Sequence, residues 1–402
     1  MSAMDDLRTT TPTALDTPSA EGTPARWWVA PLMLGERMSG PILGAACLVV
    51  IGIILTSGSY LSTIFEDILI FAIAAMGVDF LGGFGGLITL GQAGFVGIGA
   101  YGVAIAEVHG YGPWAATGIS LGAVLGLAVV TGVVAVRVSG ITFVIVTLAL
   151  GQIFWGLGYQ WTSLTSGDNG ITLLSTPSIG PWNLSSTMTV WVTTFVVFLV
   201  VLAILLLMVR SPFGLSLRGL KSNERRLRAL GYRTGLQRYI GYVIASFVAG
   251  IAGVLYIFSN HLISPATLTF SQDGFLVVMV ILGGLGTIWG PCLGALVVVM
   301  FEQEISTYLA RWETLMGVVF IAAVIFTPGG IAGLLRRGRL VLTRLVTAGR
   351  PAGPLGGPAP AVASATVAIS SAGDVLDAAR TRGDGDAATV TAAPRAPAEG
   401  DR

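Results

Sequence analysis

The sequence predicts an all-α integral membrane protein that crosses the bilayer several times. Of its 402 residues, 53% are hydrophobic and only 11% are charged, whereas soluble globular domains carry about 25% charged residues. The mean hydropathy is +0.81. Apolar runs of about 17–25 residues, the length that spans a bilayer as a helix, recur along the chain. The formal net charge of +1 gives no basic field that would favour nucleic acid.

Nine apolar runs are the candidate spans. They cover residues 41–56, 62–81, 87–108, 114–136, 141–161, 189–209, 239–260, 274–300 and 314–328. The flanking segments are rich in Thr, Pro, Ala and Gly, and the first lacks the apolar core of a signal peptide. We therefore expect disordered tails at 1–38 and 339–402 and a transmembrane domain at 39–338.

The orientation follows from the basic residues. The loop 210–238 carries eight Arg or Lys residues against the single acid Glu224, so it is expected in the cytoplasm, as are Arg336, Arg337 and Arg339. Both loops can be cytoplasmic only if the run 274–300 is a hairpin. Gly283, Gly284 and Gly286 permit a break there, and Pro291 can begin the second helix. The prediction is about ten spans, some short or broken, with both termini cytoplasmic.

Glycine-rich breaks occur twice, at 82–86 and at 283–286. Glycine inside a helix costs about 0.5–1 kcal/mol relative to alanine. The first break opens a stretch with many more glycines, GGFGGLITLGQAGFVGIGAYG at 82–102. Either helices approach closely there, or the backbone is interrupted beside a path through the membrane. The two breaks are either a weak internal repeat or a coincidence in a chain with 55 glycines.

Few residues could form an active site. Lys221 is the only lysine and follows Leu220, so no phosphate-binding GxxxxGK[ST] loop is possible. Cys47 and Cys292 lie in apolar runs and show no metal or disulfide spacing. We therefore expect no enzyme activity and no metal or cofactor on this chain, with any ATP bound by another subunit. Asp79 is the only acid that the sequence places deep in a span, as either a functional group or a helix-end acid bonded to the freed amides of the next segment.

The basic loop supports two interpretations. It is either a topology anchor on acidic lipid headgroups or an amphipathic docking helix. The helix would run through about 217–231. Leu217 and Leu220 would share a face, as would Leu227 and Leu230, and Gly231 would end the helix.

Four blocks resemble the M-type permeases of the branched-chain amino acid ABC importers, the Liv family. They are GLITLGQAGFVGIGAYG (86–102), RSPFGLSLRGLKSNERRLRALGYRTGLQRYIGYVIASFVAGIAGVLY (210–256), VVMVILGGLGTIWGPCLGALV (277–297) and FTPGGIAGLLRR (326–337). In this order the four blocks are distributed over most of 62–338. The resemblance implies a multi-pass permease in the cell (inner or plasma) membrane. Its implied partners are a homologous second permease, two cytoplasmic ATPases that hold ATP and Mg, and an extracytoplasmic binding protein.

The resemblance also assigns residues. It implies that Leu217–Gly231 couples to the ATPases, with Glu224, Ala229, Leu230 and Gly231 matching the family pattern. It places the glycine-rich stretch beside the translocation pathway, including Gly91, Gln92, Gly94 and Phe95. Thr142, Phe143 and Thr147 of the fifth span either face this pathway or pack in the core. Two positions depart from the family, which often has His in place of Gln92 and Asn in place of Asp79.

The expected function is inward movement of branched-chain amino acids by alternating access. One alternative is the same architecture with urea, a short amide or another small organic solute as its cargo. A second alternative is a stand-alone secondary transporter, which would need ionisable groups deep in several spans.

Overall fold

The computed structural model describes residues 59–173, 178–179, 182–183, 187–306, 308, 314–318, 321 and 330–333. The predicted first span (41–56), both predicted tails (1–38 and 339–402) and most of the predicted last span (314–328) lie outside the described residues.

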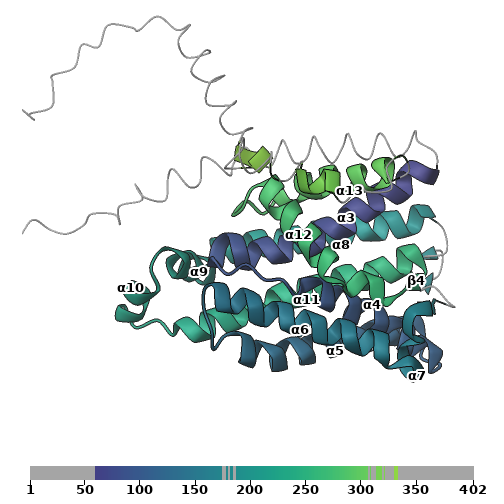
Figure 1. Ribbon diagram of the computed structural model, residues 1–402, viewed down its shortest axis with the longest axis horizontal. Helices are drawn as coiled ribbons and strands as arrows, with labels where there is room; N and C mark the ends of the chain where they lie inside the picture. Colours follow the sequence, from purple (N-terminus) through teal and green to yellow (C-terminus); the bar gives the residue numbers. More distant parts are fainter. Residues whose placement is uncertain are drawn as a thin grey trace, which may run out of the picture. The chain divides into compact units, whose positions relative to one another are not determined.

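The described chain is a bundle of α-helices, which confirms the predicted fold class (Figure 1). Its helices are α3 (Ser59–Asp79), α4 (Gln92–Val108), α5 (Pro113–Ala135), α6 (Ile141–Gln160), α8 (Thr187–Arg210), α11 (Thr234–Asn260), α12 (Phe270–Gly283) and α13 (Gly290–Ile305). Within the described residues, four of them (α5, α6, α8 and α11) are long and apolar enough to cross a membrane, and α4 and α12 are shorter apolar helices.

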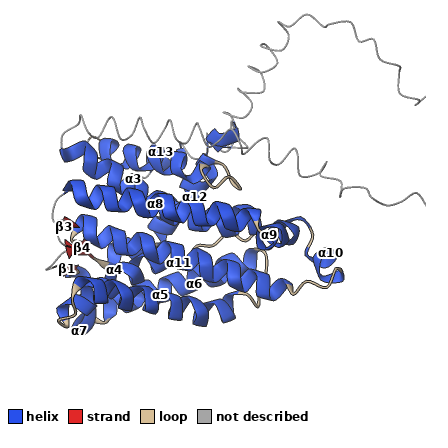
Figure 2. Ribbon diagram, turned by 180° about the vertical axis from the view of Figure 1, so that it is seen from behind, coloured by secondary structure: helices blue, strands red, loops and turns tan. Residues whose placement is uncertain are grey.

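Short elements occupy the two ends of the bundle (Figure 2). One end holds α7 (Thr162–Thr165), η3 (Gly167–Asn169), η4 (Pro265–Leu268) and two small antiparallel pairs. β1 (Ile171–Thr172) pairs with β4 (Leu262–Ile263), and β2 (Ser178–Ile179) pairs with β3 (Trp182–Asn183). The opposite end holds α9 (Pro212–Ser222) and α10 (Glu224–Ala229), which are formed by the basic loop.

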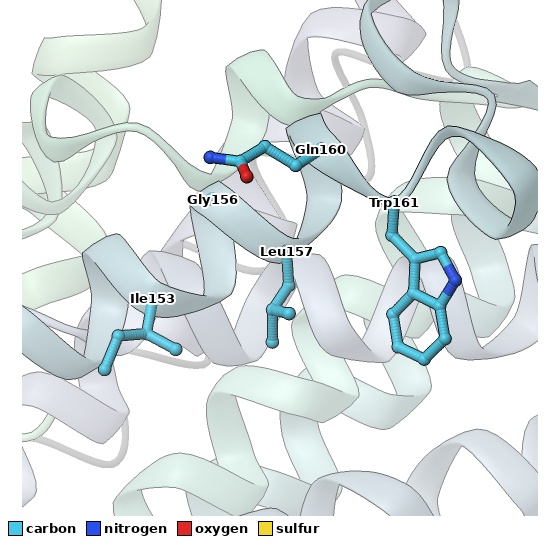
Figure 3. Close-up of a pocket in the computed structure, with 5 residues that line it drawn as sticks. All are labelled: Ile153, Gly156, Leu157, Gln160 and Trp161. Carbon is cyan, nitrogen blue, oxygen red and sulfur yellow. The ribbon is translucent and has the colours of Figure 1, made fainter.

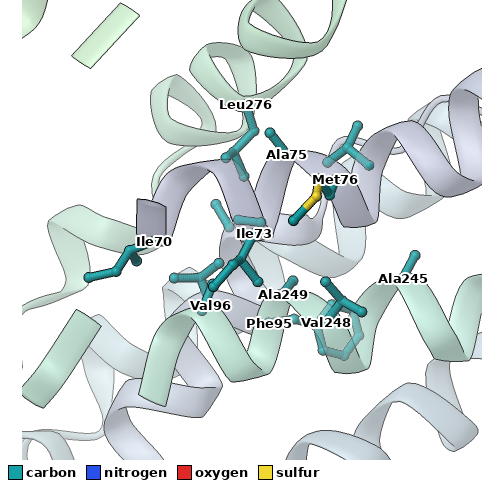
Figure 4. Close-up of a cluster of buried hydrophobic side chains, with 14 of the residues drawn as sticks. Ile70, Ile73, Ala75, Met76, Phe95, Val96, Ala245, Val248, Ala249 and Leu276 are labelled. Carbon is teal, nitrogen blue, oxygen red and sulfur yellow. The ribbon is translucent and has the colours of Figure 1, made fainter. Parts of the chain in front are cut away.

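The core lies where α3 packs against α11 and α4 (Figure 4). Ile73 and Met76 of α3 are completely or almost completely buried, as are Phe95 of α4 and Ala249 of α11. Hydrophobic residues cover much of α3, and α3 also contacts α8, α12 and α13. It is therefore the central helix of the described bundle.

Many of the glycines let helices approach closely. A Cβ on Gly253 of α11 would overlap the backbone of Val96 in α4, and a Cβ on Gly294 of α13 would overlap the Met279 carbonyl of α12. Small residues at such crossings allow backbone contact, which drives helix association in lipid. Close packing therefore explains part of the glycine content.

The other expected role of glycine, a broken backbone, occurs at both predicted places. After α3 the chain forms one π-helical turn, η2 (Phe80–Phe84), and then runs without helix from Gly86 to Gly91. The predicted third span began at residue 87, but α4 begins at Gln92, because the segment before it is irregular and includes Gly86 with φ of +72°.

The predicted hairpin in the run 274–300 is also present. Helix α12 ends at Gly283, and the chain turns through Gly284 (φ 115°) and Gly286 (φ 82°) before α13 begins. Glycine suits both turn positions because L side chains rarely adopt positive φ.

The close approach at Gly253 gives a stability prediction. We expect Gly253→Ala to destabilise the protein by about 1–3 kcal/mol, because the added methyl group must displace the α4 backbone. The matched control is Gly126→Ala in α5, where no atom lies within 4 Å of an added Cβ. Alanine is the better helix former there by about 1 kcal/mol. Thermal unfolding in detergent should give a lower Tm for Gly253→Ala only, and equal Tm values would contradict this packing.

Candidate functional site

The first part of the candidate site is the buried N-terminus of α4. The Ala93 amide donates a hydrogen bond of 2.8 Å to Oδ1 of Asp273, which lies in the first turn of α12 and is 1% exposed. A carboxylate at a helix N-terminus is stabilised by the unpaired amides and by the helix dipole. Asp273 therefore links α12 to the start of α4.

Asp273 corrects the expectation that Asp79 is the only deeply placed acid. It stands one residue before the predicted run 274–300, so it was counted as part of a loop. The structure includes it in α12, where it is enclosed by α4 and α6: a Cβ on Gly151 of α6 would lie 3.4 Å from its Oδ2. The sequence feature that could have indicated this buried acid is that Asp273 directly precedes an apolar run.

Three of the predicted pathway residues lie beside Asp273. Gln92 is completely buried, and neither polar atom of its amide has a hydrogen-bond partner in the described part of the chain. Oγ1 of Thr147 in α6 accepts a 3.2 Å hydrogen bond from the Leu90 amide. A Cβ on Gly91 would overlap the Thr147 carbonyl. Gly91, Gln92 and Thr147 thus form one buried polar site where the first break meets α6.

The remaining predicted pathway residues are arranged differently. Phe95 makes edge-to-face contacts with Phe154 (5.4 Å between ring centroids) and Tyr242 (6.0 Å), and Phe143 packs on the same tyrosine. Gly94 provides space for the Phe154 ring. For Phe143 this favours the core-packing alternative.

Thr142 and the surface hollow lie on the outer face of α6. Thr142 is exposed. Further along α6, an open hollow of about 430 Å³ is lined by Ile153, Gly156, Leu157, Gln160 and Trp161 (Figure 3). Ile153, Leu157 and Trp161 each expose about half of their surface. This face of α6 therefore presents apolar side chains to lipid or to another chain.

Asp79 forms the second part of the site. It is completely buried, and its Oδ1 accepts a 2.7 Å hydrogen bond from the Gly286 amide. Of the two hypotheses, this geometry favours the acid bonded to freed amides. The amide, however, belongs to the second break, 207 residues away, and not to the segment that follows Asp79.

The basic loop forms two helices, so the predicted single helix through 217–231 is wrong. Asn223 separates α9 from α10 with extended backbone, and its side chain accepts a 3.0 Å hydrogen bond from the Arg226 amide. This is an N-cap, which begins a new helix. The sequence feature that indicates this second helix is Asn223 followed directly by Glu224, which is typical of a helix start.

The leucines of the two helices are only partly arranged as predicted. Leu217, Leu220 and Leu227 are buried, whereas Leu230 is 69% exposed. The expected pairing of Leu227 with Leu230 is wrong, because α10 already ends at Ala229. Gly231 follows with φ of +87°, as a helix stop requires.

Glu224 joins α10 to the start of α11. Its carboxylate forms ion pairs with Arg228 (2.6 Å) and Arg238 and accepts a 3.2 Å hydrogen bond from the Thr234 hydroxyl. Burial acts to raise the pKa of Glu224, but the hydrogen bond from Arg228 and the charge of Arg238 outweigh it, so this pKa is lowered. Glu224 therefore has a structural role in holding the helix pair to the bundle.

The lowered pKa gives a pH prediction. A carboxyl group whose pKa is lower in the folded state stabilises the fold above its unfolded pKa, here 4.5. That stability is lost as the pH falls through the folded value. We expect hydrogen exchange of 223–233, corrected for intrinsic rates and followed between about pH 3 and pH 7, to accelerate in acid. In the Glu224→Gln protein, residues 223–233 should lack this protection from exchange at every pH. The Glu304→Gln protein, changed in α13, should behave as wild type. Equal protection in all three proteins would contradict this role.

The carboxylate at α4 gives a second prediction. Asp273→Ala should destabilise the protein by about 1–3 kcal/mol, because it leaves the buried Ala93 amide without an acceptor. Asp273→Asn keeps an acceptor oxygen and should cost less. Unfolding in detergent measures both, with the exposed Asp168→Ala as control. An Asp273→Ala protein as stable as this control would exclude the link.

Comparisons with known proteins identify the family. The model of the permease component of branched-chain amino acid transport systems matches residues 60–326. The chain is 26% identical over 292 residues (67% of this chain and 69% of the relative) to the high-affinity branched-chain amino acid transport system permease protein LivM of Escherichia coli (strain K12). It is 32% identical over 131 residues (32% and 38%) to the probable branched-chain amino acid transport permease protein LivM of Methanocaldococcus jannaschii, and 28% identical over 158 residues (36% and 48%) to the probable LivH of that organism. No solved structure matches the chain. The protein belongs to the family of branched-chain amino acid transport permease components.

Proposed function

We propose that this chain is the transmembrane permease subunit of an ATP-binding-cassette importer that moves branched-chain amino acids into the cell. The observation that carries the proposal is the helix pair α9–α10. It stands at one end of a bundle whose sequence matches the permease family over 60–326. Such a pair offers a surface through which a cytoplasmic motor can move the spans.

The exposed surface of this end of the bundle fits a protein partner. Leu215, Leu230, Tyr232 and Leu236 expose between about half and two thirds of their surface there. Arg225 and Arg226 are exposed beside them. An apolar centre with cations around it suits two cytoplasmic ATPase subunits, which would hold ATP and Mg. Lys221, the only lysine, donates a hydrogen bond to the Gly83 carbonyl in the first break.

The translocation path is proposed at an interface with a homologous second permease. The apolar outer face of α6, with its hollow and Gln160, supports this assignment. The buried amide of Gln92, the first residue of α4, lies on the inner side of α6 and is a candidate polar group for a zwitterionic substrate during alternating access. An extracytoplasmic binding protein would deliver the substrate at the end that carries β1 and β4.

Branched-chain amino acids are the proposed cargo because the named relatives transport them. The same architecture with urea, a short amide or another small solute is the alternative. A stand-alone secondary transporter is less well supported. The buried Asp273 already accepts the Ala93 amide, so its position has a structural reason that does not involve ion coupling.

Uptake of radiolabelled leucine by cells that carry the whole operon tests the proposal. We expect Glu224→Ala and Gly231→Pro to reduce uptake at least about fivefold, because a lost coupling contact of this kind is worth 1 kcal/mol or more. Membrane expression of each variant must equal that of wild type, and Glu304→Ala is the matched control.

Three outcomes are informative. Full uptake by both variants would contradict the docking role of α9–α10. Absence of leucine uptake in wild type, with an ATPase that still co-purifies, would move the cargo to urea or an amide. Leucine uptake without any ATPase would favour the secondary transporter.

A further inference from the structure

We infer that Lys221 and Asp79 are positioning residues that link the cytoplasmic helix α9 to both glycine breaks, so that a displacement of α9 reaches the turn between α12 and α13. The contacts follow from the geometry alone. Their use in transport rests on the proposed function.

The first contact joins α9 to the first break. Nζ of Lys221 donates a 2.7 Å hydrogen bond to the Gly83 carbonyl. The stem of the same lysine lies against Gly86, where a Cβ would approach its Cγ to 3.0 Å. One turn earlier on α9, Leu217 packs against Gly85, and the Arg218 guanidinium lies 5.2 Å from the centre of the Phe84 ring. Helix α9 therefore rests on the break along its length.

Lys221 supplies a bond that the backbone of the break does not. The carbonyls of Leu81 and Gly82 accept hydrogen bonds from Leu87 and Gly86. The carbonyl of Gly83 accepts from the lysine. Terminal carbonyls of a helix need such partners, and a bond from an ammonium group is stronger than a neutral one. Loss of Lys221 would thus loosen the end of η2.

The second contact joins the two breaks to each other. Asp79, one residue before η2, accepts the Gly286 amide at 2.7 Å. Gly83 allows this approach: an added Cβ would lie 2.7 Å from Cα of Gly286 and would overlap both the Gly286 amide and the Asp79 carboxylate. There is no room for a side chain between the breaks at Gly83, which lies against Gly286 and whose carbonyl accepts the hydrogen bond from Lys221.

The linkage continues into the helices that follow the second break. Gly286 lies in the turn between α12 and α13, and α12 carries Asp273, which binds the start of α4 beside Gln92. A shift of α9 could therefore move the buried polar site through hydrogen bonds between side chains and backbone, without bending a long helix.

Hydrogen exchange of the full-length protein in detergent tests the linkage without any transport assay. In Lys221→Met, we expect exchange of 283–290 to rise about tenfold, as for loss of a charge-assisted hydrogen bond. Exchange of 80–91 should rise too, because the Gly83 carbonyl in this segment loses its hydrogen bond from Lys221. Lys221→Arg should retain most of the protection. Arg137→Met, at an exposed cation between α5 and α6, should change neither segment.

Asp79 provides the complementary variants. Asp79→Asn keeps an acceptor for the Gly286 amide and should protect 283–290 nearly as well as wild type, whereas Asp79→Ala should not. Asp79→Ala can fail to fold, so the decisive comparison is Lys221→Met with Lys221→Arg. A rise confined to 80–91 in Lys221→Met would overturn the linkage, as would unchanged exchange in both segments.

A transport measurement separates this inference from the proposed function. In the reconstituted importer, Lys221→Met should lower the amount of leucine moved per ATP hydrolysed at least about fivefold, and Lys221→Arg should restore it. If wild type moves no leucine while the exchange results hold, the proposed cargo fails and the linkage stands. If leucine moves normally in Lys221→Met and exchange of 283–290 is unchanged, the linkage fails and the importer stands.

Discussion

Two buried carboxylates hold the interrupted helices of this protein together. Backbone amides and carbonyls inside a membrane need partners within the protein, because lipid offers none. Asp79, at the end of α3, accepts an amide of the break that follows α12, and Asp273, on α12, accepts an amide at the start of α4 after the other break. In each half of the chain, a carboxylate thus accepts a hydrogen bond from a backbone amide at the break in the other half. These two hydrogen bonds give the backbone at each break a partner within the protein.

The glycines serve both this exchange and the packing around it. At Gly253 and Gly294, the absence of a side chain lets helix backbones touch. At Gly83, it lets one break lie directly against the other, and at Gly284 and Gly286 positive φ angles turn the chain. One residue type thus meets three physical requirements. Its cost in helix stability is balanced by close contact and by turns that other residues would strain.

The helix pair α9–α10 is attached to this framework at two points. Lys221 and Leu217 place α9 on the first break, and Glu224 holds α10 to the start of α11 through Arg238 and Thr234. These residues face the bundle, whereas Leu230 and several arginines face away from it. The pair therefore has an inner face that contacts the spans and an outer face available to a partner.

The sequence by itself determined the helical membrane fold, the two glycine breaks, the hairpin of α12 and α13 and the lack of a phosphate-binding loop. These depend on local composition and on loop charge, which act over one or two turns of helix. Only the tertiary structure decided that Asp79 binds Gly286, that Asp273 is a buried acid, that Asn223 separates α9 from α10 and that Leu230 is exposed. It also decided which predicted pathway residues surround Gln92 and which pack as aromatic core. The reason is physical: these outcomes depend on which distant backbone groups come to lie within hydrogen-bonding distance, and helical periodicity carries no information about pairs separated by about two hundred residues.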